Sequence, residues 1–221
     1  MQRRAFLRVA LAGAGSIVLP RTLFAAKQCD TPASNGMPMG PQPVEYCTTG
    51  ISSVTFKQAY QQQNEWCWAA CISMVFDFYH HPVDQQRIVK ETWGTIADMP
   101  GMPDDILRDL NKSWIDDAGH AFECNGDAHS VNVDTAIQDL TDDHPLIIGA
   151  YGHATVLTAI VSEVDPATSQ YQIQQVIVRD PWPGSGGRRP LSPMEWRAID
   201  FAARIRVTDV STVVGSAHSG R

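Results

Sequence analysis

The run from Cys67 to Tyr79 constrains the fold of this chain more than any other feature, because apolar side chains cover nearly every face of the helix it predicts. A surface helix carries its apolar residues in one stripe, whereas a helix that is apolar all round is buried. Asn64 is a suitable N-terminal cap three residues before Cys67. We therefore expect a central, buried helix whose opening turn carries Cys67.

The remaining chain separates into helices followed by strands. Amphipathic patterns predict helices over residues 84–93, 104–111 and 133–142. Segments rich in Ile, Val and Thr predict strands over residues 146–150, 153–161, 171–179 and 201–207. The polar residues 112–130 are expected to form a loop. This order predicts an α+β domain in which an N-terminal helical part, built on the Cys67 helix, packs on a C-terminal antiparallel β-sheet.

Residues 1–26 have the composition of an export signal peptide. Arg3 and Arg4 precede Phe6-Leu7, the apolar stretch 9–19 and the small residues Ala25-Ala26. This pattern predicts a twin-arginine signal, with an ordinary Sec signal as the alternative. We expect the twin-arginine translocase as a partner during export, no stable membrane insertion after signal removal, and a periplasmic or extracellular location.

One domain is expected over residues 51–209. Residues 27–50 are rich in proline and predict an irregular N-terminal arm, and residues 210–221 predict a flexible tail. Beyond residue 26 the chain holds 13 basic against 24 acidic residues, a formal charge of −11. This charge argues against nucleic acid as a partner.

Five cysteines follow the signal, and an odd count in an oxidising compartment predicts two disulfides and one free thiol. We expect Cys67 to be free. A Cys29–Cys47 bond would fasten the arm, and a Cys71–Cys124 bond would tie the helix to the loop, although four cysteines allow three connectivities. A Cys67–Cys71 bond is disfavoured because four-residue spacing on a helix strains disulfide geometry.

Cys67 and His153 are the candidate nucleophile and base. A thiol in the opening turn of a helix lies near free backbone N–H groups and the positive end of the helix dipole, which favour the thiolate. Among the seven histidines, only His153 begins an apolar strand directly after a glycine, which predicts a rigidly held imidazole. The alternatives are a buried apolar role for Cys67 and a strand-edge His153 that binds only backbone.

Asp180 and Gln61 are candidates for the remaining catalytic groups. Asp180 follows the strand 171–179, which should pair antiparallel with the strand of His153, so we expect Asp180 to accept a ring N–H of His153. An ordinary Asp-Pro turn is the alternative. Gln61 precedes Cys67 by six residues, and we expect its amide and the Cys67 N–H to bind an oxyanion, with Gln62 or Gln63 as alternatives.

On these residues the chain resembles papain-like (clan CA) cysteine peptidases, above all the compact bacterial branch with bacteriocin-leader peptidases and secreted effector proteases. Gln61, Cys67-Trp68-Ala69, His153 and Asp180 match the Gln, Cys-Trp-Ala, His and Asn/Asp positions of that superfamily in its chain order. Trp182 matches the tryptophan that shields the third catalytic residue. Asp180 stands where plant papain has asparagine.

The resemblance implies an exported cysteine endopeptidase that acts on a peptide or protein substrate without a metal or organic cofactor. It implies catalytic roles for Cys67, His153, Asp180 and Gln61, and substrate contacts from Trp68, Gly152 and Trp182. One alternative is a transamidase, deamidase or cell-wall amidase that uses the same triad. Another is a non-catalytic binding module on a papain-like scaffold. A zinc site is disfavoured because His120, Cys124 and His129 are irregularly spaced.

Overall fold

The computed structural model describes residues 26–30, 44–52, 56–128, 132–165 and 167–210. The predicted export signal therefore lies outside the described residues except for Ala26, and the predicted tail lies outside them except for Val210.

The described helices are α1 (Cys67–Phe78), α2 (Gln85–Trp93), α3 (Pro103–Asp109), α4 (Val133–Thr141) and α5 (Pro193–Arg197). The first four lie where helices were predicted, and nine of the 12 residues of α1 are buried. The short α5 was not predicted. It begins with a capping box, in which the Ser192 hydroxyl accepts from the Glu195 backbone and the Glu195 carboxylate accepts from the Ser192 backbone.

The expected Asn64 cap is wrong. Helix α1 starts at Cys67 with Trp66 at the cap position, and no side chain caps it. Instead, two buried tryptophans hold its start, because the Trp66 indole donates to the Ala97 carbonyl (2.8 Å) and the Trp68 indole donates to the Met99 carbonyl (3.1 Å). Cys67 is therefore the first helical residue, where backbone N–H groups lack partners within the helix.

All strand pairs are antiparallel and form one sheet of nine strands in the order β1-β2-β6-β5-β9-β4-β3, with β7 paired to β6 and β8 paired to β7. The strands are β1 (Ala26–Asp30), β2 (Glu45–Gly50), β3 (Ser113–Ile115), β4 (Ala121–Ala128), β5 (Leu146–Ala150), β6 (His153–Val164), β7 (Tyr171–Arg179), β8 (Arg188–Leu191) and β9 (Ile199–Asp209). The four predicted strands are β5, β6, β7 and β9. Mixed helices and antiparallel sheet confirm the α+β prediction.

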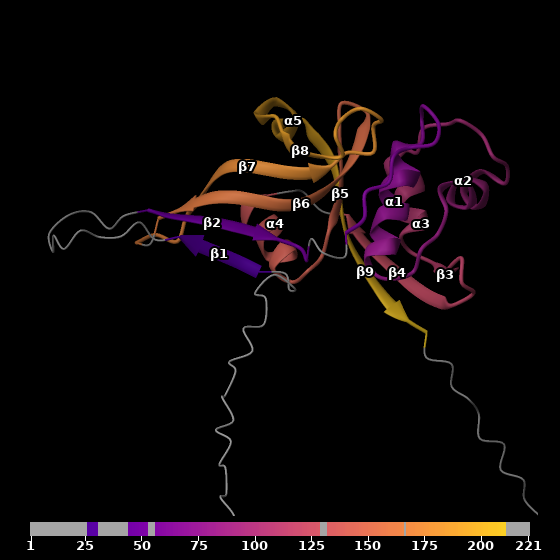
Figure 1. Cartoon of the computed structure of the whole chain (residues 1–221), viewed down its shortest axis with the longest axis horizontal. Coiled ribbons are helices and arrows are strands. Elements are labelled where there is room, and N and C mark those ends of the chain that lie inside the picture. The colour runs from indigo at the N-terminus through magenta and orange to yellow at the C-terminus, as the bar shows by residue number, and fades with distance from the viewer. Residues whose placement is uncertain (1–25, 31–43, 53–55, 129–131, 166, 211–221) are drawn as a thin grey trace, which may run out of the picture.

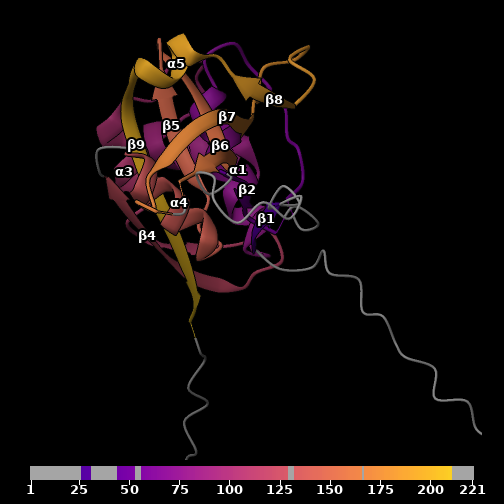
Figure 2. The ribbon, with the colours of Figure 1, turned by 90° about the vertical axis from the view of Figure 1, so that its left-hand side faces the viewer.

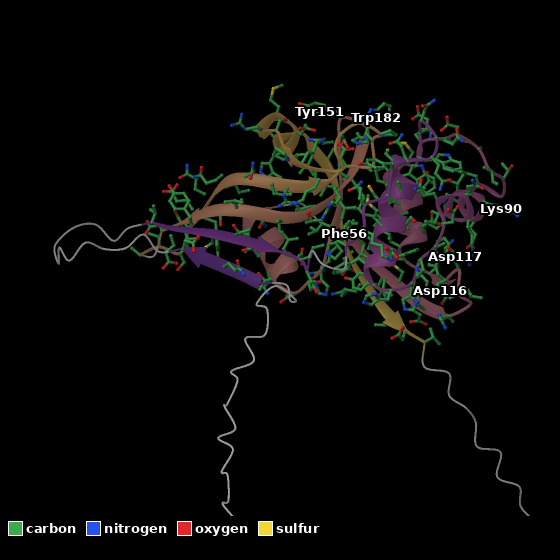
Figure 3. The ribbon with its side chains drawn as sticks, viewed as in Figure 1. Phe56, Lys90, Asp116, Asp117, Tyr151 and Trp182 are labelled. Atoms are coloured by element: carbon green, nitrogen blue, oxygen red, sulfur yellow. A yellow bond between two sulfur atoms is a disulfide. The ribbon has the colours of Figure 1, made fainter. Side chains whose placement is uncertain are left out.

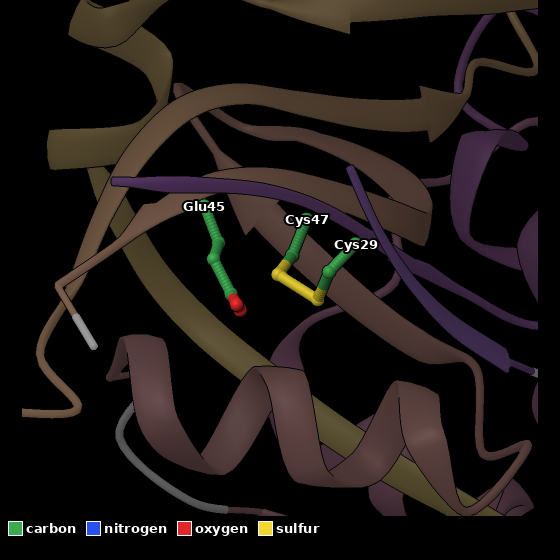
Figure 4. Close-up of side chains that lie close together, drawn as sticks. All are labelled: Cys29, Glu45 and Cys47. Carbon is green, nitrogen blue, oxygen red and sulfur yellow. A yellow bond between two sulfur atoms is a disulfide. The ribbon is translucent and has the colours of Figure 1, made fainter. Parts of the chain in front are cut away.

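The N-terminal arm is not irregular over its described residues. Strand β1 pairs with β2, and β2 pairs with the C-terminal half of β6. Cys29 lies directly opposite Cys47, and the two form a disulfide. Figure 4 shows Glu45 beside this disulfide, above α4. The three side chains lie as close as metal ligands do, but sulfurs joined in a disulfide are not thiolate ligands.

The polar segment 112–130 was predicted to be a loop, and this is also wrong. It contains β3 and β4, and β4 pairs with β9. Along β4 only Phe122, Cys124 and Gly126 face the core, since the burial alternates with the side-chain period of a strand. Three inward positions, one of them glycine, give too weak an apolar signal to mark a strand.

The molecule has a helical side and a sheet side. Figure 1 shows α1, α2 and α3 beside β5 and β9, while β6, β7, β2 and β1 extend away from them. Helix α1 packs against β6, and α4 packs against β1, β2, β6 and β7; Figure 2 gives the view from the sheet side. Among the described residues no helix is both long and apolar enough to cross a membrane. Helix α1 and strand β6 therefore meet at the junction of the two sides.

Candidate active site

Three element ends meet at this junction. Cys67 opens α1, His153 opens β6 and Asp180 follows the last residue of β7. In the antiparallel register of β6 and β7, Val156 lies opposite Arg179, so the end of β7 lies beside the start of β6. The His153 Nε2 atom lies 2.9 Å from the Asp180 Oδ1 atom. The structure thus brings together three residues that are 86 and 27 positions apart along the chain.

The His153 ring is shared between an acid and a thiol. Burial alone would lower the pKa of His153, but hydrogen bonds to Asp180 and Cys67, with the charges of both, raise it from 6.5 to about 9. Because Nε2 is used by Asp180, Nδ1 is the ring nitrogen left for Cys67. His153 is therefore arranged as an imidazolium between a carboxylate and a sulfur at neutral pH.

Asp180 is 3% exposed, and its carboxylate is fully occupied. Oδ1 accepts from His153 and from the Trp182 backbone N–H (2.8 Å), and Oδ2 accepts from Arg189 Nε at 2.6 Å. Burial would raise the pKa of Asp180, but bonds from His153, Trp182 and Arg189 outweigh burial and lower that pKa to about 2. The group is thus a buried, ionised and oriented carboxylate.

A two-residue turn holds His153 in place. Ala150 and His153 are paired across β5 and β6, and the residues between them, Tyr151 (φ 54°) and Gly152 (φ 73°), both lie in the left-handed region. Two consecutive positive φ values are typical of a type I′ hairpin turn, in which glycine is favoured at the second position. Gly152, predicted as a substrate contact, is exposed, and a Cβ atom there would meet nothing within 4 Å.

Gln61 is buried beside the same loop, but its side-chain amide is engaged elsewhere. Both N–H bonds go to loop carbonyls, those of Gln63 (2.9 Å) and Asn64 (2.6 Å). Its backbone N–H donates to the Pro181 carbonyl at 2.8 Å, next to Asp180. Gln61 therefore joins the segment before α1 to the segment after β7, and its donors do not point to a free position in this structure.

The predicted substrate contacts differ in exposure. Trp182 is 50% exposed and meets the His153 ring edge to face, with centroids 6.4 Å apart. Figure 3 shows Trp182 and Tyr151 at the same end of the molecule. Trp68 is 1% exposed, which corrects its expected role: it supports the 97–101 loop from within the core and presents no surface to substrate. A pocket of about 220 Å³ beside Trp182 is lined by Gln61, Gln62, Gln63, Asn64, Trp182 and Pro183.

The expected Cys71–Cys124 disulfide is wrong, because both thiols are free and buried. Cys71 lies one turn behind Cys67. Cys124 lies on β4 opposite Val207, near Ile205, whose carbonyl accepts from the Tyr79 hydroxyl at the far end of α1. Tyr79 is eight residues beyond Cys71, or roughly 12 Å along a helix, and disulfides need Cα atoms within about 7 Å. Burial, then the charges of Cys67 and Asp180, raises the pKa of Cys71, and burial raises that of Cys124 to about 12.

Arg189 and Glu195 were not predicted as site residues. Arg189 lies on β8, opposite Val178 of β7, and reaches Asp180; Glu195 lies on α5 and binds Arg189 at 2.8 and 3.3 Å. The Ser192-Pro193-Met194-Glu195 segment carries the capping-box signal that marks a helix start. That signal could have located α5, but not the contact of Arg189 with Asp180.

A family model described as "Peptidase_C39 like family" matches residues 55–203. A solved structure of a double glycine motif protease from an AMS/PCAT transporter, in complex with the leader peptide, is 13% identical with a TM-score of 0.44, covering 70% of this chain and 91% of that one. UfSP from C. elegans is 14% identical with a TM-score of 0.43, covering 83% of this chain and 38% of that one. No curated protein matches.

Proposed function

The chain belongs to the Peptidase_C39 like family, whose model matches more than half of it, and this confirms the predicted relationship to cysteine peptidases. From this premise we propose that the protein is an exported cysteine endopeptidase whose triad is Cys67, His153 and Asp180. The contact between His153 Nε2 and Asp180 Oδ1, together with the bond of the His153 ring to Cys67, carries the proposal. Thiolate, imidazolium and carboxylate in this order are the parts of cysteine-nucleophile acyl transfer.

In the proposed reaction the Cys67 thiolate attacks the carbonyl carbon of a peptide bond. The first N–H groups of α1 and the helix dipole stabilise negative charge on the sulfur. His153 then donates its Nδ1 proton to the leaving amine, and the C–N bond breaks to leave a thioester on Cys67. Water, deprotonated by His153, attacks the thioester and releases the acid product and the thiolate.

The backbone N–H of Cys67 is the proposed oxyanion donor, because it belongs to the first, unpaired turn of α1. Gln61 would join it only by giving up one of its two bonds to the Gln63 and Asn64 carbonyls. The substrate is proposed to lie across Trp182, which covers the edge of the His153–Asp180 pair and borders the 220 Å³ pocket.

Alkylation tests the proposal without knowledge of the substrate. We expect limiting iodoacetamide at mildly acidic pH to label Cys67 first, because its sulfur is paired with an imidazolium, and we expect His153→Ala to abolish this selectivity. Peptide mass spectrometry assigns the labelled cysteine, and His144→Ala, which removes a histidine of the α4–β5 connection, is the matched control. Slow labelling of Cys67 in the folded wild type would contradict the proposal and favour a binding module.

Hydrolysis is then tested with a peptide mixture. Cys67→Ser is expected to abolish cleavage while the protein stays folded, since the two side chains differ by one atom. Product masses that show addition of one water support a peptidase, whereas products formed only with an added amine support a transferase. Cleavage by Cys67→Ser at the wild-type rate would exclude the proposed nucleophile.

Export is a second part of the proposal. It is supported by Arg3-Arg4 and the apolar stretch 9–19, and by the Cys29–Cys47 disulfide, which needs an oxidising compartment. We expect Arg3→Lys combined with Arg4→Lys to retain the full chain in the cytoplasm, as cell fractionation would show. Unchanged export of this variant would indicate a Sec signal.

A further inference from the structure

We propose that Arg189 is a positioning residue of the active site: it fixes the Asp180 carboxylate in the orientation that receives His153. This inference rests on the proposed function, since it concerns the same triad. Arg189 does not touch the reacting atoms, and its effect passes through Asp180.

The contact with Arg189 fixes the orientation of the Asp180 carboxylate. A carboxylate that binds through one oxygen can still turn about its bond to the chain, whose rotation is broad and roughly two-fold. Asp180 Oδ1 binds His153, and Oδ2 accepts from Arg189 Nε at 2.6 Å on the other side. The second bond is charge-assisted and short, and removes this freedom.

Arg189 is itself held by contacts on the side away from Asp180. Its terminal nitrogens donate to both oxygens of Glu195, at 2.8 and 3.3 Å, while its backbone is paired with Val178. Glu195 is held by the backbone N–H of Ser192 at the start of α5. A continuous series of contacts therefore runs from α5 through Arg189 and Asp180 to the ring of His153.

Arg189 also brings a positive charge close to Asp180. Burial would lower the pKa of Arg189, but bonds to Glu195 and Asp180 raise it, so the guanidinium is charged at neutral pH. One cation thus stands between two carboxylates and partly offsets the field that Asp180 exerts on His153. Removing that cation should change both the position of the ring and its affinity for a proton.

The experiment compares Arg189→Gln, Arg189→Lys and the wild type of the full mature chain. For each protein we would measure thermal unfolding, the rate of Cys67 alkylation by iodoacetamide against pH, and kcat and KM on a cleaved peptide. Arg188→Gln is the matched control, because Arg188 is the neighbouring, exposed arginine of the same strand.

Arg189→Gln is expected to lower kcat up to about 100-fold, because small misplacements of catalytic groups have effects of this size, with KM unchanged. We expect the basic limb of the pH profile to move to higher pH, since the Asp180 charge is no longer offset. A move to lower pH would mean that Asp180 has left the ring, which also supports positioning. Arg189→Lys keeps the charge and should recover part of kcat.

The proposal is overturned if Arg189→Gln is folded and matches Arg188→Gln in kcat and in the pH profile of alkylation. It is also overturned if the loss of kcat follows only the unfolded fraction. If the proposed function itself is wrong, the result is different: Cys67 would show no selective alkylation in the wild type or in any of the variants.

Discussion

His81 and His153 are both held by acidic side chains, and of these two only His153 is placed for chemistry. His153 binds Asp180 through Nε2 and leaves Nδ1 to Cys67. His81 is buried, stacks on Phe122 at 4.4 Å, and has a carboxylate at each nitrogen: Asp116 at 3.1 Å and Asp209 at 2.8 Å.

The difference lies in what remains available. Acidic side chains hold the rings of both His81 and His153. In His81, however, each ring nitrogen contacts a carboxylate, and the ring joins the end of β9 to the turn after β3. His153 has one nitrogen committed and one nitrogen beside a thiol at an accessible end of the sheet. A histidine that contacts a carboxylate is therefore not by itself a catalytic site. The Cys67 thiol beside the free ring nitrogen is what distinguishes His153 from His81.

The largest expected effect tests this contrast directly with alanine at each histidine. His153→Ala should lower kcat by about 10²- to 10⁴-fold, the range for loss of general acid–base catalysis, with little change in thermal unfolding. His81→Ala should leave kcat unchanged and lower the unfolding temperature, because it removes a buried ring that stacks on Phe122 and joins Asp116 to Asp209 at the end of β9. Kinetics and calorimetry on both variants are the measurement. Equal loss of activity in a folded His81→Ala protein would remove the distinction.

A second comparison replaces the acidic partner of each histidine with asparagine, in Asp180→Asn and Asp116→Asn. Bonds to Asp180 and Cys67 outweigh burial and raise the pKa of His153 to about 9, so its protonated, paired state is present at lower pH and lost as the pH rises through 9. Asp180→Asn keeps an acceptor but no charge; we expect kcat to fall roughly tenfold, the difference between charged and neutral hydrogen bonds, and the basic limb to move to lower pH. A pH–rate profile checks this.

Asp116→Asn should act on acid stability instead. Bonds from His120, His81 and Ala118 outweigh burial and lower the pKa of Asp116 to about 2, from 3.8. A lowered pKa adds stability that is present above 3.8 and lost as the pH falls towards 2. The variant should therefore lose less stability over this range, with an unchanged pH–rate profile. A shifted basic limb in Asp116→Asn would contradict the separation of the two clusters.

The smallest expected effects concern the residue before each histidine. Gly152 precedes His153 at φ 73°, and His80 precedes His81 at φ 66°. A side chain in the left-handed region costs about 1 kcal/mol relative to glycine. His80→Gly should therefore raise the free energy of unfolding by about 1 kcal/mol without altering kcat, whereas Gly152→Ala should lower both stability and kcat. Denaturant unfolding and kinetics distinguish them; a stabilising Gly152→Ala would mean that the turn does not constrain His153.

The parts of the fold that could be predicted are those whose own residues carry a strong signal. Helix α1 and strands β5 and β7 have the expected bounds within one residue, because all of their buried side chains are apolar. Strand β2 was missed because its inward positions are Cys47 and Thr49, and its partner β6 lies more than 100 residues away. Local patterns do not encode such distant pairing.

The same limit applies to the candidate site. The proximity of Asp180 to His153 could be predicted from the antiparallel pairing of one hairpin. The place of Cys67 at a helix start could be predicted from the apolar pattern of that helix. Arg189 could not be found in that way, because its contact with Asp180 depends on β8 folding back onto β7 after three glycines with positive φ, Gly184, Gly186 and Gly187. Trp68 was misassigned because neighbours on a helix point in different directions.

The burial of Cys71 and Cys124 gives the protein an internal standard for active-site titration. Of the three free thiols only Cys67 is partly accessible, so a native sample should consume one equivalent of a thiol reagent and a denatured sample three. The ratio of the two stoichiometries then reports the fraction of molecules with an intact catalytic centre. This fraction can be measured before any substrate is known. Dividing a measured rate by it gives the rate per active molecule.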